Sequence, residues 1–376
     1  YFGIAASLDM VPYTFIENNR VTKLPTSDKA FPMMLGRTNR MTRRGPAADD
    51  FEAEGVLPEL TREAVAWIER RAPAAKSNDP FFLYLPLTSP HTPIVPTPEW
   101  QGKSGLNSYA DFVMQTDAAV GTVLETLHRL NLADNTLVIF TSDNGCSPEA
   151  DFNQLRASGH HPSGRFRGAK ADIFEGGHRV PFIARWPGRV KPGSSTSQLI
   201  SLNDIFATCA EILDRKMPAD AAEDSISLLP ALEGRASKPS REALVHHSIN
   251  GSFAIRRGDW KLILAPDSGG WSSPRPGSPA AKDLPAVQLY NLRDDISETN
   301  NLQGQHPRIV ADLTSELQRY VKDGRSTPGP RQANTTPVKL PDAASTDQAS
   351  HQPNSERNRF ATTGQNRPNF LFLFSG

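Results

Sequence analysis

The chain has few of the features that mark several common classes of protein. Only two of its 376 residues are cysteine, Cys146 and Cys209, too few for a disulfide framework or a thiolate zinc site. No apolar run approaches the ~18 residues that a membrane span needs, so we expect no membrane span. The 41 Lys and Arg balance the 41 Asp and Glu, which argues against a nucleic-acid partner bound through bulk charge.

What the chain does have is enough apolar material for a packed core. Hydrophobic residues make up 38% of the sequence and charged residues 22%, so the chain as a whole is not expected to be disordered. The apolar fraction is lower than in a typical globular domain, which indicates that some polar segment lowers the average. At roughly 100 to 200 residues per domain, the length suits two domains or one large α/β domain with an appendage. The first residue is Tyr and no signal-peptide pattern follows it, so we expect that an upstream segment has been lost or removed.

Apolar periodicity predicts alternating helices and strands in the first part of the chain. Helical spacing predicts helices over residues 58–72, 109–130 and 202–213. Short apolar runs over residues 81–87 and 136–141 are typical of strands buried on both faces, and residues 180–186 are a third strand candidate. This order predicts a parallel α/β sheet in which the polar residues after the first two strands share one edge.

Composition divides the chain into four predicted parts. Residues 1–215 form an α/β domain, and residues 216–325 form a C-terminal α+β subdomain with short antiparallel strands and a closing helix over 306–321. Residues 326–366, rich in Pro and polar side chains, are predicted to be a disordered linker. Residues 367–376 look like an opening strand cut off at its tip.

Three short polar segments contain residues that suit chemistry. Asp143 and Asn144 follow a predicted strand and offer oxygen ligands of the kind calcium prefers, although the same residues form ordinary turns. His91, in a proline-rich loop after another predicted strand, suits an anion or a leaving group, or is a plain surface residue. Lys170 lies in a glycine-rich stretch where it could contact an oxyanion or remain solvated.

Several motifs, in order along the chain, resemble those of the sulfatase family of the alkaline-phosphatase superfamily. Residues 81–93 look like its histidine loop, residues 137–145 its second metal-ligand segment, and residues 168–188 its active-site lysine loop. Residues 3–9 are similar to a substrate-side segment that contains Ser7, and residues 289–302 match a motif near the end of its C-terminal subdomain. The resemblance covers residues 1–325, and several ordered motifs are more specific than any one alone.

The resemblance implies a fold and an activity. The fold is an α/β sandwich like alkaline phosphatase, with a mainly parallel or mixed central sheet and a small C-terminal antiparallel sheet. The reaction is hydrolysis of a sulfate monoester, of a small molecule or a carbohydrate, by a calcium-bound formylglycine. The partner that makes this residue is the formylglycine-generating enzyme, and family members are expected in the periplasm or outside the cell.

The resemblance also assigns roles to particular residues. It places His91 at the sulfate and leaving-group oxygen, and it places Lys170 on the sulfate oxygens. Asp143 and Asn144 would supply half of a calcium site, and Ser7 would occupy a polar position on the substrate side. A cation and a proton donor aimed at the departing oxygen lower the barrier to ester cleavage, because negative charge builds there.

The family's nucleophile has no counterpart where it is expected. The formylglycine motif, Cys-x-Pro-Ser-Arg or Ser-x-Pro-Ser-Arg, would lie upstream of Tyr1, as would the paired aspartates that complete the metal site. Cys146 begins a partial match, and Ser237-Lys-Pro-Ser-Arg241 matches in full but follows every other catalytic motif, so we interpret both as coincidences. We therefore assign no nucleophile in this chain and predict that it is inactive alone.

Two other functions remain open from the sequence. A phosphodiesterase or phosphatase of the same superfamily would need further zinc ligands, and we find no Asp-x-x-x-His set. A pseudoenzyme or sulfated-glycan binding module could use the remaining half-site. Four further histidines could line a cleft or lie in solvated loops: His160, His161, His246 and His247. We interpret four other residues as structural: Tyr84, Trp100, Trp186 and Arg179.

Overall fold

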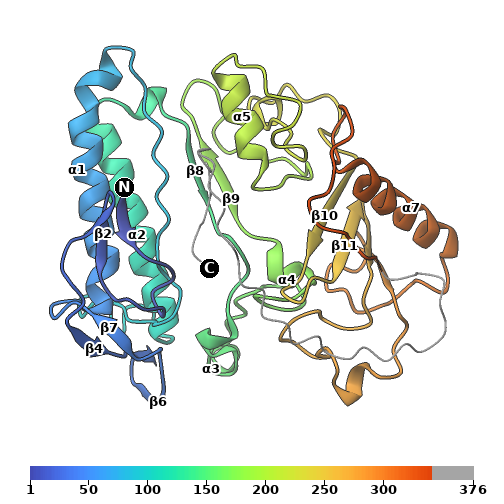
Figure 1. Ribbon diagram of the computed structural model, residues 1–376, viewed down its shortest axis with the longest axis horizontal. Coiled ribbons are helices and arrows are strands. Elements are labelled where there is room, and N and C mark those ends of the chain that lie inside the picture. Colours follow the sequence, from blue (N-terminus) through green and yellow to red (C-terminus); the bar gives the residue numbers. More distant parts are fainter. Residues whose placement is uncertain (341–376) are drawn as a thin grey trace.

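The computed structural model describes residues 1–340 and is shown in Figure 1. Most of the predicted linker over 326–366, and the whole predicted strand over 367–376, lie outside the described residues. Within them, no helix is both long and apolar enough to cross a bilayer.

The N-terminal part combines small antiparallel strand pairs with two long helices that lie side by side (Figure 1). The helices are α1 (Val56–Lys76) and α2 (Ser108–Arg129), in agreement with the periodicity. Asn107 caps α2, because its side chain accepts a hydrogen bond from the backbone N–H of Ala110. The strands are β1 (Phe2–Ile4), β2 (Phe15–Glu17), β3 (Arg20–Val21), β4 (Ser27–Lys29), β5 (Pro32–Met34), β6 (Arg37–Met41) and β7 (Gly45–Ala47).

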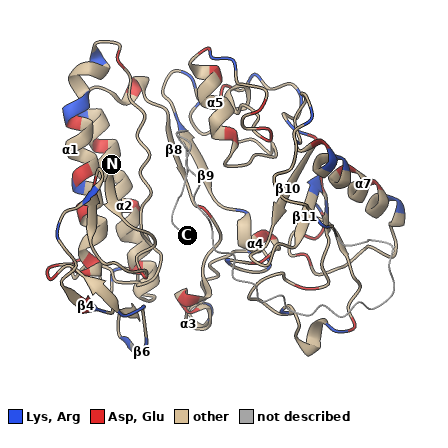
Figure 2. Cartoon of the chain, in the orientation of Figure 1, with Lys and Arg blue, Asp and Glu red and all other residues tan. Residues whose placement is uncertain are grey.

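Helix α1 is amphipathic in the expected way. Its buried side chains include Leu60 and Ile68, whereas both acidic and basic residues are interspersed along the helix (Figure 2). Some of these charges pair at the surface, as Arg62 does with Glu59 at 2.6 Å. The burial of one stripe, rather than these exposed pairs, is what holds α1 in place.

The prediction of a strand over residues 81–87 is wrong, because these residues form no regular secondary structure between α1 and α2. Their apolar side chains instead pack on the helices: Phe81 lies edge-on to Trp67 of α1, with 5.4 Å between ring centroids. An apolar run reports burial, but a strand also needs a neighbour with which its backbone can form a ladder. The run is only partly buried, since Phe82 is 56% exposed, so neither full burial nor strand pairing follows from its apolar composition.

The centre of the molecule is formed by two paired strands and the short helices around them (Figure 1). Strand β8 (Val138–Thr141) pairs with β9 (Phe182–Arg185), and both lie where the apolar runs predict strands. The pair is antiparallel, and the expected parallel central strands are not among the strands described. The short elements in this region are η2 (Ala133–Asn135), η3 (Pro148–Ala150), α3 (Phe152–Ala157), α4 (Glu175–His178), α5 (Asp204–Ile212) and α6 (Leu229–Leu232), with η1 (Ala53–Gly55) before α1.

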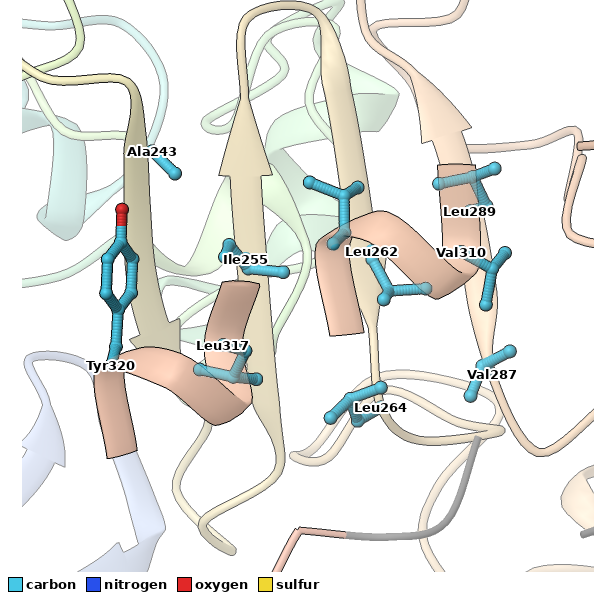
Figure 3. Packing of buried hydrophobic residues seen from close by; sticks show 10 residues of the cluster. Ala243, Ile255, Leu262, Leu264, Val287, Leu289, Val310, Leu317 and Tyr320 are labelled. Carbon is cyan, nitrogen blue, oxygen red and sulfur yellow. The ribbon is translucent and has the colours of Figure 1, made fainter. Parts of the chain in front are cut away.

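The C-terminal part is the predicted small antiparallel sheet, closed by a helix. The sheet has the order β10-β11-β12-β13, and helix α7 (Pro307–Asp323) lies over one of its faces. Figure 3 shows this packing, in which Ile255, Leu262 and Leu289 of the sheet lie in one cluster with Leu317 and Val310 of α7. The strands are β10 (Ala243–His247), β11 (Phe253–Arg257), β12 (Trp260–Ile263) and β13 (Gln288–Asn291), and η4 (Pro279–Ala281) precedes β13.

The opposite face of this sheet covers the segment that follows Lys170. Side chains alternate between faces along a strand, so Ala254 and Ile263 point away from α7. They pack on Ile173 and Phe174, just before α4, together with Tyr290. The C-terminal sheet is thus held between α7 and the loop that contains the predicted active-site lysine.

We expect the face under α7 to be the main source of stability for this part. Leu313 is fully buried there, so Leu313→Ala should lower the free energy of unfolding by about 2 to 5 kcal/mol. The measurement is urea unfolding followed by circular dichroism. Leu213→Ala, at a position 60% exposed after α5, is the control and should change it by less than about 0.5 kcal/mol. Equal midpoints for the two variants would contradict the assignment.

Candidate active site

The tip of β8 carries Asp143 and Asn144, and the chain packs closely around it. The N–H of Gly145 donates to the carbonyl of Gly177 at 2.9 Å, which brings α4 against the tip. A Cβ on Gly145 would collide with the carbonyl oxygen of Gly176, so this position requires glycine. The glycines that surround Lys170 in the sequence therefore serve backbone packing beside the predicted metal ligands.

The turn that carries Lys170 is attached to the same tip. The N–H of Lys170 donates to the carbonyl of Cys146 at 2.9 Å, three residues after Asp143. The next residue, Ala171, has a φ of 83°, a backbone conformation that residues other than glycine rarely adopt. The buried carboxylate of Asp172 stabilises the turn by accepting a hydrogen bond from the N–H of Ala169 at 2.8 Å.

His91 and Ser7 meet through an aspartate that the sequence motifs do not single out. The hydroxyl of Ser7 donates to Oδ1 of Asp9 at 2.6 Å, and the same oxygen lies 4.0 Å from Nδ1 of His91. Nδ1 also lies 2.8 Å from the carbonyl oxygen of Thr92. A carbonyl oxygen only accepts hydrogen bonds, so this contact requires Nδ1 to carry a proton. Nε2 takes no part in the contact.

Asp143 lies within electrostatic reach of both Lys170 and His91. Burial raises the pKa of Asp143, while the charges of Lys170 and His91 lower it by smaller amounts. The net direction is upward, so Lys170 and His91 do not fully compensate the carboxylate for its lost water. A further cation beside Asp143 would restore that balance. Burial and the Asp143 carboxylate also raise the pKa of Tyr84, which places this wall residue near the same site.

The predicted metal ligands, Asp143 and Asn144, are too few to complete a site by themselves. No group of three or more His, Cys, Asp or Glu side chains in residues 1–340 is arranged to hold a metal ion. Asp143 and Asn144 offer a carboxylate and an amide oxygen, whereas calcium takes six to eight oxygens. The amide nitrogen of Asn144 donates to the carbonyl of Gly145 at 3.2 Å. The donor types suit calcium, and their number fits part of a site.

The partial match at Cys146 and the full match over residues 237–241 both have structural explanations. Burial raises the pKa of the Cys146 thiol to about 11, which makes it a poor nucleophile at neutral pH. In the segment 237–241, Ser237 is exposed but Arg241 is buried in an ion pair with Asp204 of α5. That pairing accounts for an arginine at this position without any modification chemistry.

A buried ion cluster lies behind the Lys170 turn. The ammonium of Lys261, fully buried on β12, lies 3.0 Å from Oε1 of Glu175 and 2.8 Å from Oε1 of Glu298. It also donates to the carbonyl of Ile173 at 2.9 Å. For Glu175, burial raises the pKa, but Lys261 and His178 lower it by more, so the net pKa is below the usual value. For Glu298, burial is the dominant effect and the net pKa is above the usual value. Lys261 thus ties α4 to the C-terminal sheet.

The histidine pairs fall into two different environments. His160 and His161 are exposed. His246 instead stacks on His178 of α4, with 3.7 Å between ring centroids, so it is part of the packing behind α4. Burial and the Lys261 ammonium lower the pKa of His178 to about 4, so it is neutral at pH 7.

The other residues interpreted as structural keep that role in the folded chain. Arg179 pairs with Glu175 at 3.1 Å, and its guanidinium lies 4.9 Å from the centre of the Phe166 ring. Trp186 is buried. Lys103 lies over the ring of Trp100.

Sequence reasoning misses the charged residues that hold the site in place. Asp9, Asp172, Glu175 and Glu298 lie within the sulfatase-like motifs, but the sequence assigns them no role. Lys261 carries a usable signal, because a single charge within the apolar run Trp260-Lys-Leu-Ile-Leu264 must be paired if the strand is buried. Its two partners are far away in the chain and leave no local signal.

Comparison with known proteins assigns the family. The family model described as Sulfatase matches residues 14–214. An N-acetylgalactosamine-6-O-sulfatase of Bacteroides thetaiotaomicron is 34% identical over 357 residues, which cover 85% of this chain and 67% of that protein. Human arylsulfatase A is 33% identical over 276 residues, covering 71% of this chain and 52% of that protein.

Solved structures agree with this assignment. A Bacteroides thetaiotaomicron structure from work on the metabolism of multiple glycosaminoglycans superposes with a TM-score of 0.71 at 34% identity, covering 85% of this chain and 71% of the other. Ps i-CgsB in complex with k-i-k-neocarrahexaose has a TM-score of 0.56 at 25% identity, covering 77% and 60%.

The chain belongs to the sulfatase family, a family of sulfuric ester hydrolases, as the ordered motifs indicate. Its structural neighbours are sulfatases of the alkaline-phosphatase-like fold. It spans about two thirds of the length of the Bacteroides relative, about half that of human arylsulfatase A and about a third that of rat steryl-sulfatase.

The buried ion cluster gives a test of what holds the site in place. Lys261→Met should lower the free energy of unfolding by about 3 to 5 kcal/mol at pH 7, because it removes the cation that pairs with the buried Glu298 and one of the cations that pair with Glu175. Thermal unfolding at several pH values also tests the direction in which the loss of stability changes with pH. Without Lys261, the pKa of the buried Glu298 carboxylate would rise further and the folded state would bind a proton better, so the loss of stability should be larger at pH 8 than at pH 5.

Lys23→Met is the matched control for this substitution. Lys23 pairs with Asp50 where both side chains are about 60% exposed, so its loss should leave the unfolding midpoint unchanged. A Lys261→Met variant as stable as this control at pH 8 would show that the cluster does not hold the fold together.

Proposed function

We propose that this chain forms the sulfate-binding and leaving-group side of a sulfatase active site. The observation that carries the proposal is the proximity of His91, Lys170 and Asp143, which come from three separate segments yet interact electrostatically. Surface residues without a common role would have no reason to meet at one partly buried point.

Each residue has a role that its chemistry suits. The Lys170 ammonium would bind sulfate oxygens, and His91 would stabilise or protonate the oxygen that leaves. Thr92 and Asp9 would fix the imidazole, since its Nδ1 lies against both. Ser7, held by Asp9, would contribute a polar contact on the substrate side.

Asp143 and Asn144 would hold calcium together with ligands beyond those assigned in this chain. When bound, the metal would screen the charge of the ester and activate the nucleophile. The upward pKa of Asp143 supports a cation at this point. The nucleophile would be a formylglycine supplied by the formylglycine-generating enzyme in the complete protein, and this chain alone would be inactive.

For the substrate we propose a sulfated carbohydrate. The support is the similarity to a relative named N-acetylgalactosamine-6-O-sulfatase and to a structure that contains a neocarrahexaose. An extracytoplasmic location, expected from the family, agrees with such substrates.

Binding of a sulfated sugar tests the anion site directly. Lys170→Ala should weaken binding of N-acetylgalactosamine 6-sulfate about tenfold or more, because a charge-assisted hydrogen bond to the sulfate is lost. The measurement is titration followed by NMR. Lys191→Ala, at an exposed lysine, is the control and should bind as the original chain does. Equal affinity for the phosphate analogue would favour a phosphatase instead, and unchanged binding by Lys170→Ala would refute the proposal.

Turnover distinguishes an incomplete enzyme from a complete one. We expect this chain to release no nitrophenol from 4-nitrophenyl sulfate, with or without calcium, while it still binds the sulfated sugar. The measurement is an absorbance assay over several hours with and without a chelator. Hydrolysis that the chelator abolishes would contradict the expected inactivity. Binding without turnover by the full-length protein, rather than by this chain, would favour a glycan-binding module.

A further inference from the structure

Two loops of the C-terminal sheet are attached to the turn that carries Lys170. In the loop between β10 and β11, the N–H of Ile249 donates to the carbonyl of Ala171 at 3.0 Å. In the loop between β12 and β13, the N–H groups of Trp271 and Ser272 both donate to Oδ1 of Asp172, at 2.8 and 2.9 Å. The acceptors are the two residues that directly follow Lys170.

These attachments are close and mutually supporting. Asp172 is 3% exposed and uses its other oxygen to hold the Lys170 turn itself. A Cβ on Gly270 would lie 2.5 Å from the carbonyl oxygen of Ala171, so the backbone of this loop approaches the turn directly. The two loops also meet each other, since the N–H of Asn250 donates to the carbonyl of Gly269 at 3.3 Å.

Each loop presents one large apolar side chain to solvent beside this turn. Ile249 is 63% exposed and Trp271 is 40% exposed. Single exposed apolar residues are ordinary. These two differ because the backbone of each is hydrogen-bonded to one turn, and that turn carries the ammonium proposed to bind sulfate. Neither residue is used by the packing of the sheet or by the buried ion cluster.

We propose that Ile249 and Trp271 form an apolar rim that receives the ring of the sulfated substrate. This inference rests on the proposed function, because it assumes that Lys170 holds the sulfate. A sulfated monosaccharide is charged at one end and presents C–H groups on one face of its ring. An indole can stack on such a face, and Ile249 can cover its edge. The rim would then select esters of ring compounds over inorganic sulfate.

The test compares two probes, N-acetylgalactosamine 6-sulfate and inorganic sulfate, in NMR titrations of this chain. Trp271→Ala should weaken binding of the sulfated sugar about tenfold and leave inorganic sulfate unchanged. Trp271→Phe should restore most of the affinity, because an aromatic face remains. Ile249→Ala should have a smaller effect, about threefold, whereas Leu213→Ala, at a similarly exposed leucine after α5, should have none.

The outcomes separate this inference from the function on which it rests. If Lys170→Ala abolishes binding of both probes but Trp271→Ala binds the sugar normally, the rim is refuted and the anion site stands. If Lys170→Ala changes neither probe, the proposed function fails first. A Trp271→Ala variant that loses both probes equally would show a structural effect on the Lys170 turn and would also refute the rim.

Discussion

The burial of Lys261 between Glu175 and Glu298 is the constraint on which the candidate active site depends. An ammonium that is fully buried has lost its water, and the two carboxylates and the carbonyl of Ile173 replace it. Because Glu175 begins α4 and Lys261 lies on β12, satisfying this one charge fixes the lysine loop against the C-terminal sheet. The alternating faces of β12 allow this: Leu262 packs under α7 while Lys261 and Ile263 face the loop.

The site is then assembled mainly by backbone contacts rather than by its functional side chains. Lys170 is attached to the β8 tip through the carbonyl of Cys146, and Gly145 is attached to α4 through the carbonyl of Gly177. Such contacts leave the ammonium of Lys170 and the carboxylate of Asp143 available for ligands. The incomplete compensation of Asp143 and the fixed imidazole of His91 are the properties that an anionic ester and a cation could use.

The same arrangement gives the C-terminal sheet two roles. One face packs under α7 and supplies stability, and the other supports the lysine loop. Its connecting loops reach the Lys170 turn through Ala171 and Asp172, so changes in those loops would alter the surroundings of the proposed sulfate site without replacing the residues proposed to bind sulfate. This separation of anchoring from recognition agrees with a family whose members act on different sulfate esters, among them the N-acetylgalactosamine-6-sulfatases and steryl-sulfatases similar to this chain.

The local elements and the family can both be predicted from the order of the amino acids. Helices α1, α2, α5 and α7, strands β8 and β9, and the antiparallel C-terminal sheet follow from apolar periodicity, which is a local property. The ordered motifs around His91, Asp143 and Lys170 identify the sulfatase family. Three features emerge only when the chain is folded: residues 81–87 pack on helices without forming a strand, β8 runs antiparallel to β9, and Lys261 finds two acids far away in the chain. Pairing partners and burial of charge depend on which distant segments meet, and no local pattern records that.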